Sequence, residues 1–303
     1  MTLITAFAAP GHFYRGNIHT HSTRSDGVRS PEEVCRAYRE GGYDFLCLSD
    51  HFVPHFDFPI VDTTPYRTET FTTIFGAEIH APANSHGEIW HLLACGLPLD
   101  FPPLGENEDA VSLARRAVEA GAFLGIAHPQ WSGLSIEDGR SMANIAHSVE
   151  IWNTGCAREC DRGDGTALLD ALLSEGYRLS GYAADDAHFK IKDWMGGWMM
   201  VKAEANTPEV LLAAMKRGDY YSSRGPALHS VAVEGDEVVV ECSAVRGISV
   251  VGRGSRAEYL EQSEAGPLTQ GRLSLKRFAG DWCRVVVMDE HDRQAWTNPI
   301  WLD

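Results

Sequence analysis

The sequence has 303 residues, enough for one large hydrophobic core or for two domains. Hydrophobic residues make up 44% of it and charged residues 22%, which is the composition of an ordinary globular protein. The formal net charge of −16 would repel nucleic acids and anionic membranes, because both are bound largely through attraction to phosphate. We therefore expect neither of them as a partner.

The sequence also indicates a cytoplasmic location. No apolar run approaches the ~18 to 20 residues of a membrane span. The N-terminal segment, MTLITAFAAPGHFYRG, has no basic residue before its apolar part, which argues against a signal peptide. The seven cysteines are an odd number and form no CxxC pair, which favours a reducing compartment.

The first two thirds of the chain alternate short apolar strands with amphipathic helices. The first predicted helix, residues 30–43, has Ser30 as N-cap, Pro31 in its first turn and Glu33 completing a capping box. Alternation of this length predicts a parallel sheet or barrel. The expected strands cover residues 13–19, 45–51, 73–80, 89–96, 123–129, 148–153 and 178–188, and the further helices 112–122, 166–177 and 207–221.

The pattern changes after SSRGPAL at residues 222–228. Residues 229–254 and 274–302 alternate with period two and turn at Gly-Asp pairs, which is typical of antiparallel strands. We place a boundary there and expect domains at 1–223 and 224–303, the second of them small and all-β. Its tryptophans, Trp282, Trp296 and Trp301, favour a core or interface role over sugar binding.

Imidazoles and carboxylates lie, nearly all of them, at the C-terminal ends of the predicted strands. In a parallel barrel the carboxyl ends of the strands converge on one mouth, which is the usual place for catalysis. A single strand-end histidine is most often an ordinary polar residue. When several strand ends each carry such a group, the groups form a buried polar cluster, which costs free energy unless something compensates it. We therefore interpret the cluster as a metal site. The residues concerned are His19, His21, Asp50, His51, Glu78, His80, His91, His128, Asp186 and His188.

These motifs together resemble a known superfamily. HTHSTRSDG, LSDH, GAEI, WHLLACG, AHP and DDAH, in that order, are similar to the PHP (polymerase and histidinol phosphatase) superfamily over about residues 13–223. The segments RGDYYSSRGPAL and AWTNPIWL resemble its carbaryl-hydrolase branch. The resemblance implies a distorted seven-stranded β/α barrel, followed here by the small all-β domain.

The resemblance also implies two or three divalent metal ions, and the mixed ligands suit Zn, Mn or Fe. By motif, Glu78 would bridge the first two ions. The first would be held by His19, His21, Glu78 and Asp186, the second by Glu78, His91 and His128, and the third by Asp26, His51 and His188.

Three further choices concern neighbouring residues. We prefer Asp186 to Asp185 because Asp186 would share a strand face with His188. His80 shares a face with Glu78, so it is either an outer donor, a general acid or a surface residue. Asp50 is expected to support the ligands from behind. We assign catalytic roles to Glu78, Asp186 and His188.

The predicted activity is metal-dependent hydrolysis of a small phosphate ester by a metal-bridging hydroxide. The alternative is hydrolysis of a carboxylic or carbamate ester at the same centre, and a non-catalytic binding module is a third hypothesis. No P-loop and no GxSxG elbow occur in the sequence. The expected partner is a small phosphate or carboxyl ester, and the sequence assigns no oligomeric state.

Overall fold

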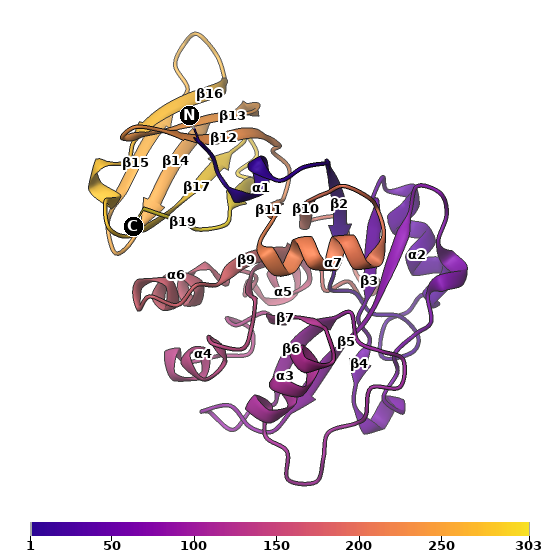
Figure 1. Ribbon diagram of the computed structural model, residues 1–303. Helices are drawn as coiled ribbons and strands as arrows, with labels where there is room; N and C mark the ends of the chain where they lie inside the picture. Colours follow the sequence, from indigo (N-terminus) through magenta and orange to yellow (C-terminus); the bar gives the residue numbers. More distant parts are fainter. Residues whose placement is uncertain (1, 303) are drawn as a thin grey trace.

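A computed structural model describes residues 2–302 and shows a mixed α/β fold with two β-sheets in that range (Figure 1). The larger sheet has fifteen strands in the order β15-β14-β17-β18-β11-β10-β2-β3-β5-β6-β7-β8-β9, with β19 beside β17 and β4 beside β5. The smaller sheet has the order β1-β12-β13-β16. The strands up to residue 223 are β1 (Thr2–Leu3), β2 (His12–Asn17), β3 (Phe45–Leu48), β4 (His51–Phe52), β5 (Thr72–Ala81), β6 (Trp90–Cys95), β7 (Phe123–Ile126), β8 (Ser148–Asn153), β9 (Ser180–Ala184), β10 (Trp198–Ala203) and β11 (Tyr220–Ser223).

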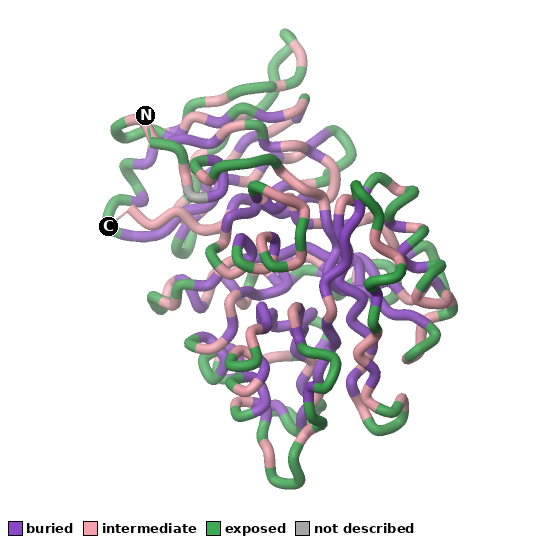
Figure 2. Tube along the Cα trace, turned by 45° about the vertical axis from the view of Figure 1, so that its right-hand side comes forward, coloured by how far each residue is buried: buried purple, intermediate pink, exposed green. Residues whose placement is uncertain are grey.

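Helices cover the strands of the larger sheet. α2 packs on β3, α3 on β5, β6 and β7, α6 on β8 and β9, and α7 on β5, β7 and β10. In Figure 2 the buried segments follow the strands, while the exposed ones follow loops and the outer faces of helices. The helices are α1 (Thr5–Ala8), α2 (Pro31–Glu40), α3 (Ala110–Glu119), α4 (Ile136–Met142), α5 (Thr154–Cys160), α6 (Thr166–Ser174) and α7 (Pro208–Arg217), with short 3-10 turns η1 (Pro54–Phe56), η2 (Thr64–Tyr66) and η3 (Lys276–Phe278).

The predicted capping of α2 is confirmed. The Ser30 hydroxyl accepts from the Glu33 amide, and the Glu33 carboxylate accepts from the Ser30 amide, so two of the free donors of the first turn are satisfied. This fixes where the helix begins, directly after the loop that carries His19, His21 and Asp26. The apolar face of α2 buries Val34, Cys35 and Tyr38 against β3.

The expected strand-helix alternation is confirmed, whereas the closed seven-stranded barrel is not. β2, β3 and β5 pair in parallel, as do β7, β8 and β9, but β6 is antiparallel to both β5 and β7. The connection from β5 to β6 is too short for a parallel crossover, which needs about a dozen residues or more. Within residues 2–302 no ladder joins β9 to β2 or β10, so the sheet stays open apart from one isolated bridge between Thr20 and Ala187.

The C-terminal strands form a second core of their own. Val231, Val240, Ile248 and Val285 belong to it, and Phe7 from α1 packs into it. β1 pairs with β12 and β18 pairs with β11, so the predicted division near residue 224 is crossed by strand pairing and stays a prediction. The strands are β12 (Leu228–Glu234), β13 (Glu237–Val245), β14 (Gly247–Gly252), β15 (Ala257–Glu261), β16 (Leu268–Ser274), β17 (Trp282–Met288), β18 (Gln294–Thr297) and β19 (Ile300–Trp301).

The tryptophans of this region favour the core interpretation. Trp282 and Trp296 are buried, and Trp301 lies under the guanidinium of Arg178, 4.4 Å from the ring centroid. All seven cysteines are free thiols, so no disulfide constrains the fold. In the described chain, none of the helices has both the length and the apolar character needed to cross a membrane.

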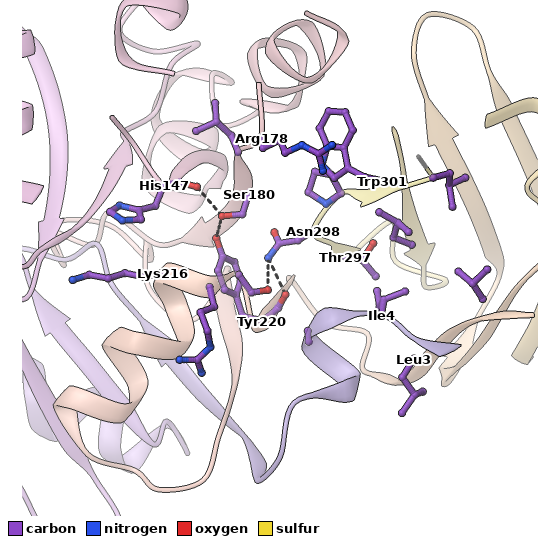
Figure 3. Close-up of a pocket in the computed structure, with 18 of the residues that line it drawn as sticks. Leu3, Ile4, His147, Arg178, Ser180, Lys216, Tyr220, Thr297, Asn298 and Trp301 are labelled. Atoms are coloured by element: carbon purple, nitrogen blue, oxygen red, sulfur yellow. Dashed lines mark hydrogen bonds between the residues drawn. The ribbon is translucent and has the colours of Figure 1, made fainter. Parts of the chain in front are cut away.

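A polar network lies at the amino ends of β8 and β9 (Figure 3). Ser180, the first residue of β9, places its hydroxyl 2.6 Å from the Tyr220 hydroxyl, as Figure 3 shows. The hydroxyl of Ser148, the first residue of β8, lies 3.0 Å from the same group. The Asn298 side chain donates to the carbonyls of Gly218 and Tyr220 and accepts from the Gly181 amide. The network borders a cavity of about 660 Å³, which is lined by residues of the N-terminal segment, the start of β9, the end of α7 and the C-terminal segment.

Candidate metal centre

The nine predicted ligands lie in one cluster, at the opposite end of β8 and β9 from the Tyr220 network. His80 joins them as a tenth member. Four groups within the cluster each have donor atoms that all lie within 4.8 Å of one another. These groups are His21/Asp26/His51/His188, His51/Glu78/His80/His91, His19/His128/Asp186 and His19/His21/Glu78.

Glu78 occupies the centre of the cluster. Its side chain is fully buried on β5, and imidazoles surround both carboxylate oxygens. Oε1 lies 2.7 Å from His91 Nδ1 and 3.1 Å from His128 Nε2. Oε2 faces the imidazoles of four other histidines, His19, His21, His51 and His80, at 2.7 to 3.8 Å. A carboxylate shared in this way has the arrangement expected of a group that bridges cations.

Asp186 closes the deep side of the cluster. Its Oδ1 lies 2.9 Å from His21 Nε2 and 3.3 Å from His19 Nε2, while Oδ2 accepts from the Asn153 side chain. The sequence pattern placed Asp186 on one strand face with His188, but β9 ends at Ala184, so Asp186 does not lie in a strand. Its φ of 54° is left-handed, and this backbone conformation turns the side chain inward.

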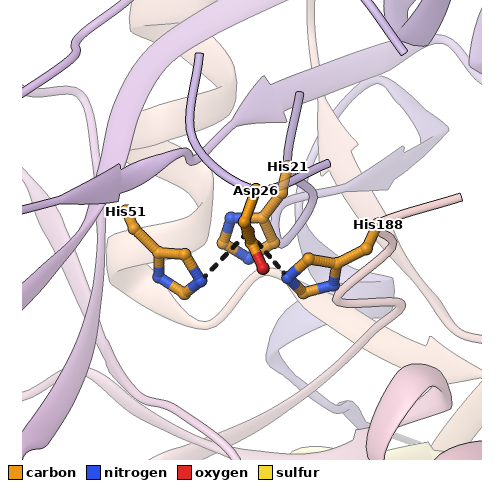
Figure 4. A group of neighbouring side chains, drawn as sticks. All are labelled: His21, Asp26, His51 and His188. Atoms are coloured by element: carbon orange, nitrogen blue, oxygen red, sulfur yellow. Dashed lines mark ion pairs between the residues drawn. The ribbon is translucent and has the colours of Figure 1, made fainter. Parts of the chain in front are cut away.

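Asp26 lies at the outer side, between two imidazoles (Figure 4). Its Oδ1 is 3.1 Å from His188 Nε2 and 3.4 Å from His51 Nε2. His21 stacks on both of these rings, with centroids 4.2 Å from His51 and 4.3 Å from His188. The other Asp26 oxygen, Oδ2, accepts from Lys190 at 2.9 Å. The structure therefore brings Asp26, His51 and His188 together, as their motifs imply.

Strand polarity explains how His91 reaches the cluster. His91 was expected at the carboxyl end of its strand. It lies instead at the second position of β6, which runs antiparallel to β5. The register places His91 directly opposite His80, and their rings are 4.3 Å apart. The amino end of β6 therefore meets the same edge of the sheet as the carboxyl ends of β5 and β7, its antiparallel neighbours.

Sequence reasoning missed Glu150, which supports the ligands from behind. It is buried on β8, accepts from His19 Nδ1 at 3.0 Å and accepts from the His128 amide at 2.6 Å. A carboxylate on one ring nitrogen fixes the tautomer and leaves the other nitrogen free to bind a metal. The available signal was a lone acid within SVEIWN, a strand that is otherwise almost entirely buried.

Two further aspartates hold loops. Asp50 accepts from the Ser22 amide and from the Ser22 and Ser25 hydroxyls, which fixes the segment between His21 and Asp26. Asp185 faces away from the cluster and accepts from the Tyr38 hydroxyl and from three successive amides, those of residues 195–197. Both carboxylates position the groups that face the cluster.

The electrostatics of the metal-free protein follow from this crowding. Burial alone would raise the pKa values of Glu78 and Asp186, but the neighbouring imidazoles, His51 and His19 foremost, lower both well below their usual range. Burial, together with the charges of His51 and His188, lowers the pKa of His21 to about 3. Neutral imidazole and ionised carboxylate are the forms that bind metal.

The donor set fits divalent cations. Eleven buried side-chain nitrogen or oxygen atoms lack a hydrogen-bond partner in residues 2–302, and four of them lie here. A buried polar atom without a partner costs about 1–3 kcal/mol, which bound cations would offset. The four atoms are His19 Nε2, His21 Nδ1, Asp26 Oδ1 and Glu78 Oε2.

No family model matches the sequence, and no curated protein matches it significantly. Among solved structures, it is similar to a two-domain protein of Bacteroides vulgatus ATCC 8482 that contains a predicted PHP-like metal-dependent phosphoesterase. The TM-score is 0.54 at 15% identity, over 97% of this chain and 98% of that one. Weaker likenesses, both with a TM-score of 0.44, concern a candidate metal-dependent phosphoesterase of Bifidobacterium adolescentis (16% identity, 59% of this chain and 89% of that one) and an amidohydrolase of Chromobacterium violaceum (12% identity, 57% and 87%).

The fold and the cluster define a mixed α/β protein with a cluster of imidazole and carboxylate donors suited to divalent metals. The likeness to the Bacteroides protein spans nearly all of both chains, and it shows that this chain shares the fold of that protein, which contains a predicted PHP-like phosphoesterase. The fold predicted from the motifs is confirmed in that respect. The closer likeness to a carbaryl-hydrolase branch finds no support in these structures and stays a prediction.

Proposed function

We propose that this chain is a divalent-metal-dependent hydrolase that cleaves a small phosphate ester. The observation that carries the proposal is the central carboxylate of Glu78, which six imidazoles surround at 2.7 to 3.8 Å and which keeps one oxygen without a hydrogen-bond partner. Such a group at the edge of a PHP-like fold is what a polynuclear hydrolytic centre needs. The PHP-like phosphoesterase name of the structural neighbour supports the same reaction class.

The ligand assignment follows the motifs, and the observed groups match it in part, since they place His128 with His19 and Asp186 and place His91 with Glu78. His19, His21, Glu78 and Asp186 would hold a first ion, Glu78, His91 and His128 a second, and Asp26, His51 and His188 a third. The third set lies within one of the observed groups, whose remaining member is His21. When bound, such ions polarise a substrate oxygen and lower the pKa of a coordinated water, and Zn, Mn and Fe all suit these ligands.

The chain's own residues then orient the substrate and limit its size. The cavity over the cluster has a volume of about 230 Å³ and is lined by ligands together with Trp131, Cys156, Glu159 and Lys190. Pockets for drug-sized ligands are about 300–1,000 Å³, so this one fits a small ester. Lys190, 46% exposed beside Asp26, adds positive charge at the side where a phosphate oxygen would enter.

The test compares two substrate panels on protein of known metal content. Elemental analysis after purification without added metal identifies the ions, and the stripped protein is then reloaded separately with Mn, Zn or Fe. We expect turnover of phosphate monoesters that requires metal. Turnover of aryl carboxylic or carbamate esters alone would overturn the phosphoesterase proposal in favour of the alternative hydrolase.

A variant pair tests whether the cluster is a metal site at all. His19→Ala should lose bound metal and turnover together, because His19 belongs to two of the observed groups. His229→Ala, which changes an exposed histidine on β12, is the control and should lose neither. Unchanged metal content and turnover in His19→Ala would contradict the proposal.

A further inference from the structure

Trp131 lines the cavity over the histidine-carboxylate cluster, and a large part of its side chain is exposed to solvent. It is 42% exposed, and of the seven large exposed hydrophobic residues within 2–302 it is the one that lines this cavity. Its ring stands nearly edge-to-face against those of two histidines, with centroids 4.9 Å from His128 and 5.4 Å from His91. An apolar ring is thus presented to solvent directly beside the reacting centre.

The loop that carries Trp131 is held on both sides. The Ser132 amide donates to the His128 carbonyl, and the Leu134 amide donates to that of Pro129. The Ser132 hydroxyl lies 2.9 Å from His128 Nδ1, so the ring of a predicted ligand is tied to the same turn. Asn84, from the β5–β6 loop, donates to the Ser132 carbonyl. These hydrogen bonds fix the backbone of the turn before a ligand binds. Binding against the indole therefore loses less conformational entropy than binding against a mobile loop would.

The shape of the cavity limits what the indole could meet. About 230 Å³ leaves room for a phosphate group over the cluster and one small group beside it. A flat aromatic group in that place would cover exposed indole surface and gain the geometry-dependent attraction of an aromatic pair. A saturated group of the same size would gain only the free energy of removing apolar surface from water.

We propose that Trp131 is a specificity-determining residue that selects small phosphate monoesters whose alcohol part contains a single aromatic or heteroaromatic ring. The inference rests on the proposed phosphoesterase function and names its substrate class. In the reaction the oxygen of water adds to phosphorus, the bond between phosphorus and the ester oxygen breaks, and the proton from water ends on the released alcohol. Trp131 takes no part in these bond changes and acts through binding.

The experiment compares benzyl phosphate with cyclohexylmethyl phosphate on Mn-loaded protein. Their leaving groups are both primary alcohols, so the ring is the main difference between them. We expect benzyl phosphate to have the higher kcat/KM by about 2- to 10-fold, the range that aromatic pairs provide. The difference should lie in KM, because the ring binds equally in the ground and transition states.

Trp131→Leu should remove the preference by raising KM for benzyl phosphate alone, with metal content unchanged, and Trp131→Phe should keep part of it. Tyr259→Leu, which removes the other exposed aromatic ring, 73% exposed on β15, is the matched control and should keep it in full. Equal kcat/KM values for the two esters in the unchanged protein would overturn the inference, as would a preference that survives in Trp131→Leu.

Calorimetry with benzylphosphonate and cyclohexylmethylphosphonate separates this inference from the function on which it rests. These probes bind without being cleaved. If neither phosphate ester is turned over, the phosphoesterase proposal fails. The selectivity of Trp131 is then supported by tighter binding of benzylphosphonate that Trp131→Leu abolishes, and overturned by equal binding.

Discussion

The two ends of β8 and β9 each border a buried polar cluster, and the clusters differ in how their hydrogen bonds are completed. At the amino ends, the Tyr220 hydroxyl lies within hydrogen-bond distance of Ser148 and Ser180, and these two hydroxyls also donate to backbone carbonyls. At the carboxyl ends, four side-chain atoms of the histidine-carboxylate cluster have no partner. A completed network stabilises the fold by itself, whereas an incomplete one costs free energy until a ligand completes it.

This difference separates structural polar residues from binding ones by a criterion that does not depend on motifs. Both clusters are buried, and both draw residues from distant parts of the sequence. Burial raises the pKa of Tyr220 to about 12, so its hydroxyl stays neutral and needs no counter-ion. The histidine-carboxylate cluster instead gathers three carboxylates and seven imidazoles, a set of donor atoms that fits divalent cations. Variants of the two clusters should therefore change different quantities.

The largest effect is expected for Glu78→Gln. The substitution keeps the shape but removes the negative charge that the first two sets of ligands share, so metal content should fall and kcat should drop by roughly 10³-fold, the effect of several kcal/mol of lost charge stabilisation. Elemental analysis and steady-state kinetics measure the two losses. Glu88→Gln, an exposed residue of the β5–β6 loop, is the control, and an equal loss in it would show that the effect is not local.

Glu150→Gln should weaken metal binding by about 10- to 100-fold, the usual effect of removing an outer partner of a metal-ligating histidine. The amide can no longer orient His19 as an ionised acceptor does. Competition with a chromophoric chelator measures the dissociation constant. Glu119→Gln, at the exposed end of α3, provides the comparison. Unchanged affinity in Glu150→Gln would remove this residue from the metal centre.

A smaller effect concerns pH. Without metal, burial lowers the pKa of His188, but its ion pair with Asp26 and the nearby Asp186 carboxylate raise it to about 9. A metal needs the neutral imidazole, so binding at neutral pH should release a proton from His188. Affinity should rise with pH by up to about tenfold per unit and level off above pH 9. Titration calorimetry in buffers of different ionisation enthalpy measures that proton, and His188→Asn should lose its contribution.

The smallest effect is expected at the completed network. Tyr220→Phe removes a hydroxyl bonded to Ser148 and Ser180 and should lower the free energy of unfolding by about 1 kcal/mol. Metal content should not change. Urea unfolding of the metal-free protein measures the loss, with the exposed Tyr259→Phe as control. Loss of metal in Tyr220→Phe would contradict the separation of the two clusters.

Local features of the fold could be predicted from the sequence, because neighbouring residues determine them. The capping box of Ser30 and Glu33 requires only four consecutive residues, and the helix begins where the pattern placed it. The antiparallel direction of β6 and the open edge at β9 depend on which strands meet, and hydrophobic runs do not encode that choice. The position of His91 was therefore expected at the wrong end of its strand.

The proximity of the clustered residues could be predicted where residue types are rare, and a neighbour was missed where they are common. His-x-His and Asp-x-His stand out from any background, and all ten clustered residues were noticed in the sequence, although their role as ligands stays a prediction. Glu150 was missed because a single glutamate in a strand has no distinctive neighbour. The inward direction of Asp186 depends on a left-handed backbone, which Asp adopts more readily than most residues but which alternation along a strand does not describe.

The adjacent carboxylates of Asp185 and Asp186 point to opposite sides, and this couples the loop of residues 195–197 to the histidine-carboxylate cluster. Two of the three amides that donate to the Asp185 carboxylate are those of Gly196 and Gly197. A Cβ added at Gly196 would lie 2.4 Å from the Thr154 side chain, and one added at Gly197 would lie 2.7 Å from the Trp152 ring. A side chain at Gly196 or Gly197 would crowd this segment, displace Asp185 and so shift the neighbouring Asp186 carboxylate. The geometry of the proposed metal site therefore depends on two glycines that lie outside it.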